Sequence, residues 1–204
     1  MKILLVADAP DPALWEYYQP GKLDGYDLIL SAGDLEAEYL SFLVTMTNVP
    51  VLYVHGNHNE GYDRFPPEGC ECIEDRLVTV KGLRILGLGG SARYSDGKYQ
   101  YTEGQMRRRI ARLNRAVKKA GGVDIVVTHC PPRGYGDADD YAHRGFEAFL
   151  PMLERWKPKA VVHGHIHLAY GIPRERVLGD THIINAYMRC TVTADAKTDI
   201  SLLR

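Results

Sequence analysis

Short apolar runs recur along this 204-residue chain, and each ends at or just before a block of polar residues. Runs of this length, rich in valine, isoleucine and leucine, predict buried strands. They occupy residues 2–7, 26–31, 49–54, 123–128 and 159–162. The blocks that follow them are Asp8, Gly33-Asp34, Gly56-Asn57-His58, His129 and Gly164-His165-Ile166-His167. We therefore expect several strands to deliver carboxylate, amide and imidazole groups to one edge of a sheet.

Oxygen and nitrogen ligands clustered in this way hold hard or borderline divalent metals. The order and types of the five blocks resemble those of the calcineurin-like metallophosphoesterases, which hydrolyse phosphate esters with two bridged metal ions. The resemblance covers nearly the whole chain. It has one gap, because the family's first block reads Asp-x-His and this chain has Pro10 in place of the histidine.

The resemblance implies one intact metal site. Asp34 would bridge both metals, since a carboxylate offers several lone pairs and a charge that offsets two cations. Asn57, His129 and His165 would complete the second site around it. Taken alone, Gly33-Asp34 also fits the N-cap of a helix that starts at residue 35.

The other site is expected to be weaker. By the resemblance it would use Asp8, Asp34 and His167, and the spacing of His165 and His167 predicts that both project to the same side of an extended segment. Pro10 offers no ligand atom, so the affinity of this first site should be lower. Asp11 either reaches into the gap or is an exposed loop residue.

The resemblance also implies a mechanism. Two divalent cations, with Mn²⁺ favoured over Fe, Zn, Ni or Mg, would lower the pKa of a bridging water, and the metal-bound hydroxide would attack phosphorus. His58 matches the catalytic residue that assists the leaving oxygen. The family usually follows it with Asp or Glu, whereas this chain has Asn59, so a helper carboxylate is absent at that position.

Two irregular segments are candidates for binding the substrate. Residues 130–145 form a long predicted loop after His129, and residues 87–94 form a Gly-rich turn. We expect His143 and Arg93 to be the substrate-binding groups on these segments, with a surface role as the alternative. Residues 158–186 resemble the small phosphodiesterase branch of the family, which includes proteins active on cyclic nucleotides. A small phosphate ester, and a phosphodiester rather than a phosphomonoester, is therefore the expected substrate.

The remaining pattern indicates an α/β protein. Polar-apolar segments near 12–18 and 35–47 separate the first strands, Lys81-Gly82 marks a hairpin, and helices are predicted over 103–120 and 145–156. Short strands are expected over 177–203. The resemblance sharpens this to a four-layer α/β/β/α sandwich with two mixed sheets, in a single domain over residues 1–204.

Charge and cysteine content limit the class of protein. A formal net charge of −1 argues against a broad grip on nucleic acid, and the basic residues of the 103–120 helix are interpreted as a solvated face. The sequence has no run long enough to span a membrane. The four cysteines lack paired Cys-x-x-Cys spacing, which favours reduced thiols and a cytoplasmic protein. An oligomer is possible. The alternative to an enzyme is a scaffold or ligand-binding protein that keeps the fold with a weakened metal site.

Overall fold

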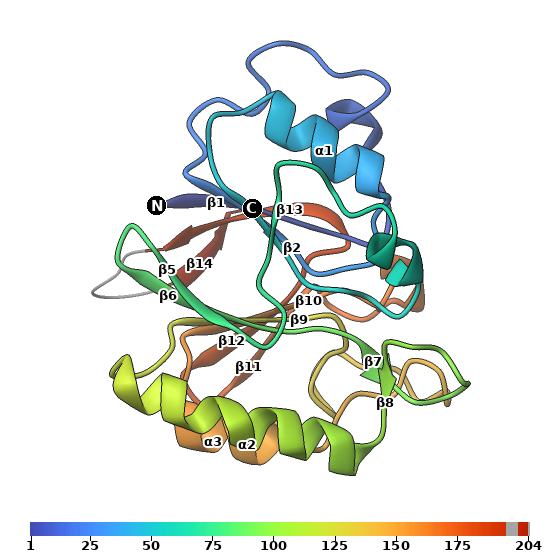
Figure 1. Ribbon diagram of the computed structural model, residues 1–204, viewed down its shortest axis with the longest axis vertical. Helices are drawn as coiled ribbons and strands as arrows, with labels where there is room; N and C mark the ends of the chain where they lie inside the picture. Colours follow the sequence, from blue (N-terminus) through green and yellow to red (C-terminus); the bar gives the residue numbers. More distant parts are fainter. Residues whose placement is uncertain (195–199, 204) are drawn as a thin grey trace.

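The computed structural model describes residues 1–194 and 200–203. Within these residues, two six-stranded sheets pack face to face, with α1 outside one sheet and α2 and α3 outside the other (Figure 1). The three helices span Ala37–Thr45, Glu103–Lys119 and Phe149–Trp156. The predicted four-layer α/β/β/α sandwich is therefore confirmed.

The first sheet is mixed and contains the three N-terminal strands. Its order is β14-β13-β1-β2-β3-β4, with bounds Ile200–Leu203, Met188–Ala194, Lys2–Ala7, Leu28–Ser31, Val51–Tyr53 and Glu71–Cys72. Strands β1 to β4 run parallel, and β13 pairs antiparallel with β1. Because parallel strands end at the same edge, the segments after β1, β2 and β3 lie together.

The second sheet repeats this arrangement. Its order is β11-β12-β10-β9-β6-β5, with bounds Glu175–Leu178, Thr181–Asn185, Ala160–His163, Ile125–Thr128, Leu83–Leu88 and Leu77–Val80. Strands β6, β9, β10 and β12 are parallel, and β5 and β6 form the predicted hairpin. A small parallel pair, β7 (Ser91–Ala92) and β8 (Gln100–Tyr101), follows β6.

Alternation along β1 shows how the layers are held together. Ile3 and Leu5 belong to the core between the two sheets, whereas Leu4 and Val6 pack in the cluster that includes α1. Successive side chains on a strand point to opposite faces, so a strand covered on both sides reads as one continuous apolar run. This burial is why the predicted strands were visible in the sequence.

The long helix α2 follows its sequence signals closely. Thr102 and Gln105 form a capping box at its start, and Gly121 and Gly122 follow its end with positive φ angles. Its apolar face is buried as predicted. One basic residue departs from the predicted solvated face: Arg109 is only 7% exposed.

The polar-apolar segment 12–18 is mostly not helical, and one predicted helix is too long. Of segment 12–18, only Pro12–Leu14 is helical, as a short 3₁₀ helix that Asp11 caps. The helix predicted over 145–156 begins at Phe149, because residue 146 pairs with Pro132 in an isolated bridge. The Glu103 carboxylate also accepts the N–H groups of residues 147 and 148, which fixes the chain before α3 begins. None of the helices in the described residues combines the length and apolar character needed to cross a membrane.

Candidate metal centre

Three predicted ligands converge at the carboxyl edges of the two sheets. Asp34 follows β2, His129 follows β9 and His165 follows β10, and one ligand atom from each lies within 4.8 Å of the others. Asn57, after β3, joins them, since its Oδ1 lies 3.0 Å from Nε2 of His129. The same Nε2 lies 3.1 Å from Oδ2 of Asp34. Four groups from both sheets thus surround one small region.

The backbone turns sharply where these side chains enter the site. Asp8, Asp34 and His165 have φ angles of 66°, 57° and 67°, in the left-handed region that non-glycine residues rarely occupy. A Cβ on Gly33 would lie 2.5 Å from the backbone nitrogen of Gly56, so these loops pack too closely for any larger residue. Backbone strain of this kind persists where the surrounding structure enforces it, and it clusters at functional sites.

The ring of His129 is oriented by the backbone. Its Nδ1 donates to the carbonyl of Ala32 at 2.8 Å, which leaves Nε2 to face Asn57 and Asp34. Burial opposes charge on this ring, yet the adjacent Asp34 carboxylate raises the pKa of His129 to about 9. Burial would likewise raise the pKa of Asp34, but His129 outweighs it and lowers the pKa to about 2.

The ring of His165 is also oriented by a backbone carbonyl, but through Nε2 rather than Nδ1. Its Nε2 donates to the carbonyl of Ala142 at 2.9 Å, which leaves Nδ1 available as a ligand. Burial, together with the charge of His129, lowers the pKa of His165 to about 3. The ring is therefore neutral at physiological pH, which is the form that binds a metal.

Asp8 provides a test of whether a cation fits. One carboxylate oxygen, Oδ1, accepts the backbone N–H of His165 at 2.8 Å. The other, Oδ2, is buried and has no hydrogen-bond partner within the described residues. Burial, and to a smaller extent the charge of Asp34, raise the pKa of Asp8. A buried carboxylate oxygen beside a second carboxylate needs a positive charge, so the donor set fits a divalent metal.

Comparison with known proteins agrees with this geometry. Residues 1–169 match the family described as calcineurin-like phosphoesterase. The chain belongs to this family. Human metallophosphoesterase domain-containing protein 1 is 28% identical over 206 residues, which covers 81% of this chain and 60% of that protein. UPF0046 protein T07D4.2 of Caenorhabditis elegans is 30% identical over 129 residues, or 62% of this chain and 30% of that protein.

The chain therefore spans less than two thirds of the length of these curated relatives. Among solved structures, TT1561 of Thermus thermophilus has a TM-score of 0.63 at 13% identity, over 98% of this chain and 97% of that one. GAP50, the anchor in the inner membrane complex of Plasmodium, has a TM-score of 0.56 at 13% identity, over 94% and 80%. At this identity the likeness concerns the fold alone.

The family's first metal site has one gap here, at Pro10. Pro10 has no ligand atom, and Asp11 does not replace it: one oxygen caps the 3₁₀ helix and the other pairs with Arg189 at 2.7 Å. Asp11 is 8% exposed, so neither alternative considered for it was correct. His167 is exposed and lies against Tyr187, with 4.7 Å between ring centroids.

His165 and His167 lie in different environments. His165 has a left-handed φ of 67° and is buried in the cluster, whereas His167 is exposed. That both side chains project to the same side stays a prediction. His167 is not part of the three-residue cluster found among the described residues.

Asn59 has a structural role that was not predicted from the sequence. Its side-chain oxygen accepts the N–H groups of Asp34 and Gly56, at 2.8 and 2.7 Å. The adjacent His58 leaves its side chain exposed, while its backbone N–H donates to Oδ1 of Asp34 at 2.8 Å. Asp34 is not a helix N-cap, since α1 begins at residue 37 and is preceded by Glu36.

The candidate substrate residues lie in different settings. The His143 ring is 5.1 Å from that of His165, and its Nδ1 contacts Asp140 at 2.8 Å and the Tyr170 hydroxyl at 3.0 Å. Arg93 is exposed at the end of the short β7–β8 pair.

The sequence did not indicate a role for Tyr94, the residue after Arg93. Its hydroxyl accepts a hydrogen bond from Nδ2 of Asn57 at 2.9 Å and so orients that amide. Tyr94 was not among the predicted site residues because tyrosine is an uncommon metal ligand.

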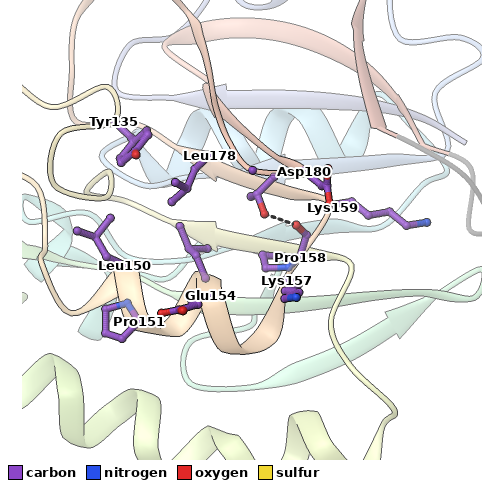
Figure 2. A pocket seen from close by; sticks show the side chains of 12 residues that line it. Tyr135, Leu150, Pro151, Glu154, Lys157, Pro158, Lys159, Leu178 and Asp180 are labelled. Carbon is purple, nitrogen blue, oxygen red and sulfur yellow. Dashed lines mark hydrogen bonds between the residues drawn. The ribbon is translucent and has the colours of Figure 1, made fainter.

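A cavity of about 710 Å³ lies between α3 and the β11–β12 turn (Figure 2). Its walls include Leu150, Leu178 and Tyr135. Thr181 also lines it and donates to the Pro158 carbonyl at 2.7 Å. None of the predicted site residues lines it. The cavity is therefore separate from the cluster in which the chemistry is expected.

Proposed function

We propose that this chain is a metal-dependent phosphoesterase that hydrolyses a small phosphodiester in preference to a phosphomonoester. The observation that carries the proposal is the convergence of Asp34, His129 and His165 within 4.8 Å, with the Asn57 amide beside them. Family membership supports phosphoester hydrolysis. The resemblance of residues 158–186 to small phosphodiesterases favours the diester.

The metal-binding groups divide into two sets that share one residue. Asp34, Asn57, His129 and His165 would hold one divalent ion, and Asp8, Asp34 and His167 would hold the other. Bound there, divalent cations neutralise charge on a phosphate and lower the pKa of water. The carboxylate and amide oxygens in both sets suit Mn²⁺, which we propose as the native metal.

His58 would protonate the leaving oxygen. Its backbone is fixed by the hydrogen bond to Asp34, while its imidazole is exposed at the edge of the cluster. Histidine is the side chain that most often serves as a general acid or base, which suits His58 to this proton transfer. His143, beside His165, and Arg93 would contact the substrate, and Arg93 would supply positive charge for phosphate.

The test uses purified protein stripped of metal and reloaded with Mn²⁺. Hydrolysis of bis(p-nitrophenyl) phosphate should exceed that of p-nitrophenyl phosphate. Asp34→Ala should abolish both hydrolysis and tight Mn²⁺ binding in a calorimetric titration. His58→Ala should lower turnover by about 10²–10⁴-fold while metal binding is retained. His182→Ala is the matched control, because its ring contacts Glu175 on β11 and should leave turnover unchanged.

One observation favours the alternative of a scaffold or ligand-binding protein. Pro10 stands where the family has a histidine ligand, and Asp11 pairs with Arg189 instead of replacing that ligand. If wild-type protein with metals bound hydrolyses no ester in a broad panel, and Pro10→His gains activity, the scaffold is correct and the enzyme is not.

A further inference from the structure

A cleft of about 330 Å³ opens directly beside the proposed catalytic residues. It lies between the start of α1 and the 3₁₀ helix Asn59–Asp63, and both His58 and Asp34 line it. Because His58 is the proposed acid for the leaving oxygen, whatever occupies this cleft is adjacent to that oxygen. The cleft is therefore on the leaving-group side of the site.

Two aromatic residues line the cleft. Phe65 is 63% exposed, which is high for a large apolar side chain, and Tyr62 is buried. The backbone N–H of Phe65 donates to the Gly61 carbonyl at 2.9 Å, which anchors the residue at the end of the 3₁₀ helix. An exposed ring fixed to the wall of a cleft provides a surface on which a flat or alkyl group can pack.

Two acidic residues also line the cleft. Glu36 and Glu38, at the start of α1, are both exposed and line it, and Glu36 makes no capping hydrogen bond. The helix N-terminus contributes only about half a positive charge, which is less than the two carboxylates carry. The Arg64 guanidinium lies 5.0 Å from the centroid of the Phe65 ring, but Arg64 does not line the cleft.

We propose that this cleft binds the leaving alcohol and selects apolar alcohols that are neutral or cationic over those that carry an anionic group. Phe65 supplies the apolar contact, and Glu36 and Glu38 repel a second negative charge. The proposal rests on the proposed phosphoesterase function and narrows its substrate class. It implies that esters whose leaving alcohol bears a further phosphate or carboxylate are poor substrates.

The experiment uses three matched methyl phosphodiesters and the Mn²⁺-loaded protein. Their second alcohols are benzyl alcohol, 4-(aminomethyl)benzyl alcohol and 4-carboxybenzyl alcohol, and product analysis identifies the alcohol released. We expect kcat/KM for the aminomethyl ester to exceed that for the carboxy ester by about tenfold, the size of effect that one or two nearby surface charges produce. The double variant Glu36→Gln/Glu38→Gln should bring this ratio close to one.

Two further variants separate charge from packing. Phe65→Ala should lower kcat/KM for all three benzyl esters alike and leave their ratio unchanged. Glu68→Gln is the charge control, since Glu68 lines the neighbouring hollow along α1 but not this cleft. It should leave the ratio at the wild-type value. Circular dichroism would verify that each variant is folded.

The outcomes distinguish failure of the cleft assignment from failure of the phosphoesterase proposal. If wild-type protein hydrolyses the esters and the double variant keeps the wild-type ratio, the cleft assignment is overturned and the phosphoesterase proposal stands. A wild-type preference for the carboxy ester also overturns the assignment, because the α1 N-terminus would then dominate. If no ester is hydrolysed, the proposed function fails and this inference fails with it.

Discussion

The side-chain oxygen of Asn59 accepts the backbone N–H of Asp34 at 2.8 Å, and through this bond the turn after β3 holds the turn after β2. The same oxygen accepts the N–H of Gly56, and Nδ2 donates to the Leu35 carbonyl at 3.1 Å. One buried amide therefore satisfies three backbone groups around the proposed bridging carboxylate. It stabilises the left-handed conformation of Asp34.

Replacing Asn59 should disturb stability and metal binding together. Asn59→Ala leaves two N–H groups without their acceptor, and we expect a loss of about 1–3 kcal/mol in the free energy of unfolding. Asn59→Asp keeps the acceptor and should cost less. Urea unfolding and a calorimetric Mn²⁺ titration would measure both effects. Wild-type affinity and stability in Asn59→Ala would contradict this role.

Metal binding should be asymmetric, and Pro10 is the reason. The set that contains His129 should fill first and more tightly than the set that contains Asp8. Pro10→His should tighten the weaker site by about tenfold or more, since even indirect partners of a metal change affinity by 10–100-fold. Asp11→Asn is the control and should leave both affinities unchanged, because Asp11 pairs with Arg189 and caps the 3₁₀ helix. Two equally tight metals in the wild type would argue against this asymmetry.

Asp137 should matter for metal affinity although it is outside the cluster. Its carboxylate accepts the N–H groups of Gly134 and Gly145, at 2.7 and 2.9 Å, and pairs with Arg133 at 2.6 Å. These bonds close the loop whose Ala142 carbonyl holds His165.

The expected effect of Asp137→Ala is a 10–100-fold loss of metal affinity, the range found when an outer partner of a metal ligand is removed. Asp139→Ala is the matched control, because Asp139 is exposed on the same loop. Isothermal titration with Mn²⁺ gives the readout. Equal affinities for the two variants would show that the loop does not position His165.

Arg109 should be a strong determinant of stability. It is buried on α2, pairs with Glu74 and Asp75, and donates to the Gly89 carbonyl at 2.9 Å. Arg109→Ala removes the guanidinium from the buried Glu74 carboxylate, which among the described residues keeps only its bonds from His55 and Gly89, and we expect a loss of about 3–5 kcal/mol. Arg112→Ala, exposed on the same helix, should change stability by less than about 0.5 kcal/mol.

The cost of Arg109→Ala should also depend on pH. Burial would raise the pKa of Glu74, but hydrogen bonding to His55 and the charge of Arg109 outweigh it and lower the pKa. A lowered carboxyl pKa contributes stability above the unfolded value, about 4.3, which is lost as the pH falls through the folded value. The difference between wild type and variant should therefore shrink from pH 7 to below pH 4. Unfolding curves at both pH values would reveal it, and a constant difference would exclude the Glu74 pair as its source.

Much of the fold was readable from the sequence because it depends on local patterns. Strands buried on both faces appear as continuous apolar runs, and α2 carries both its capping box and its terminal glycines. The polar blocks could be assigned to one edge because parallel strands end together. Of the predicted ligands, Asp34, Asn57, His129 and His165 do lie together in the structure.

Other features were decided by contacts between residues far apart in the chain. Asn59 reaches Asp34 across 25 positions, and Arg109 reaches Glu74 across 35. The pairing of Asp11 with Arg189 joins opposite ends of the sequence and removes Asp11 from the gap left by Pro10. A sequence pattern records which side chains are apolar and how they are spaced. Which polar partner each buried group finds depends on how the two sheets and their loops pack, and only the tertiary structure determines that.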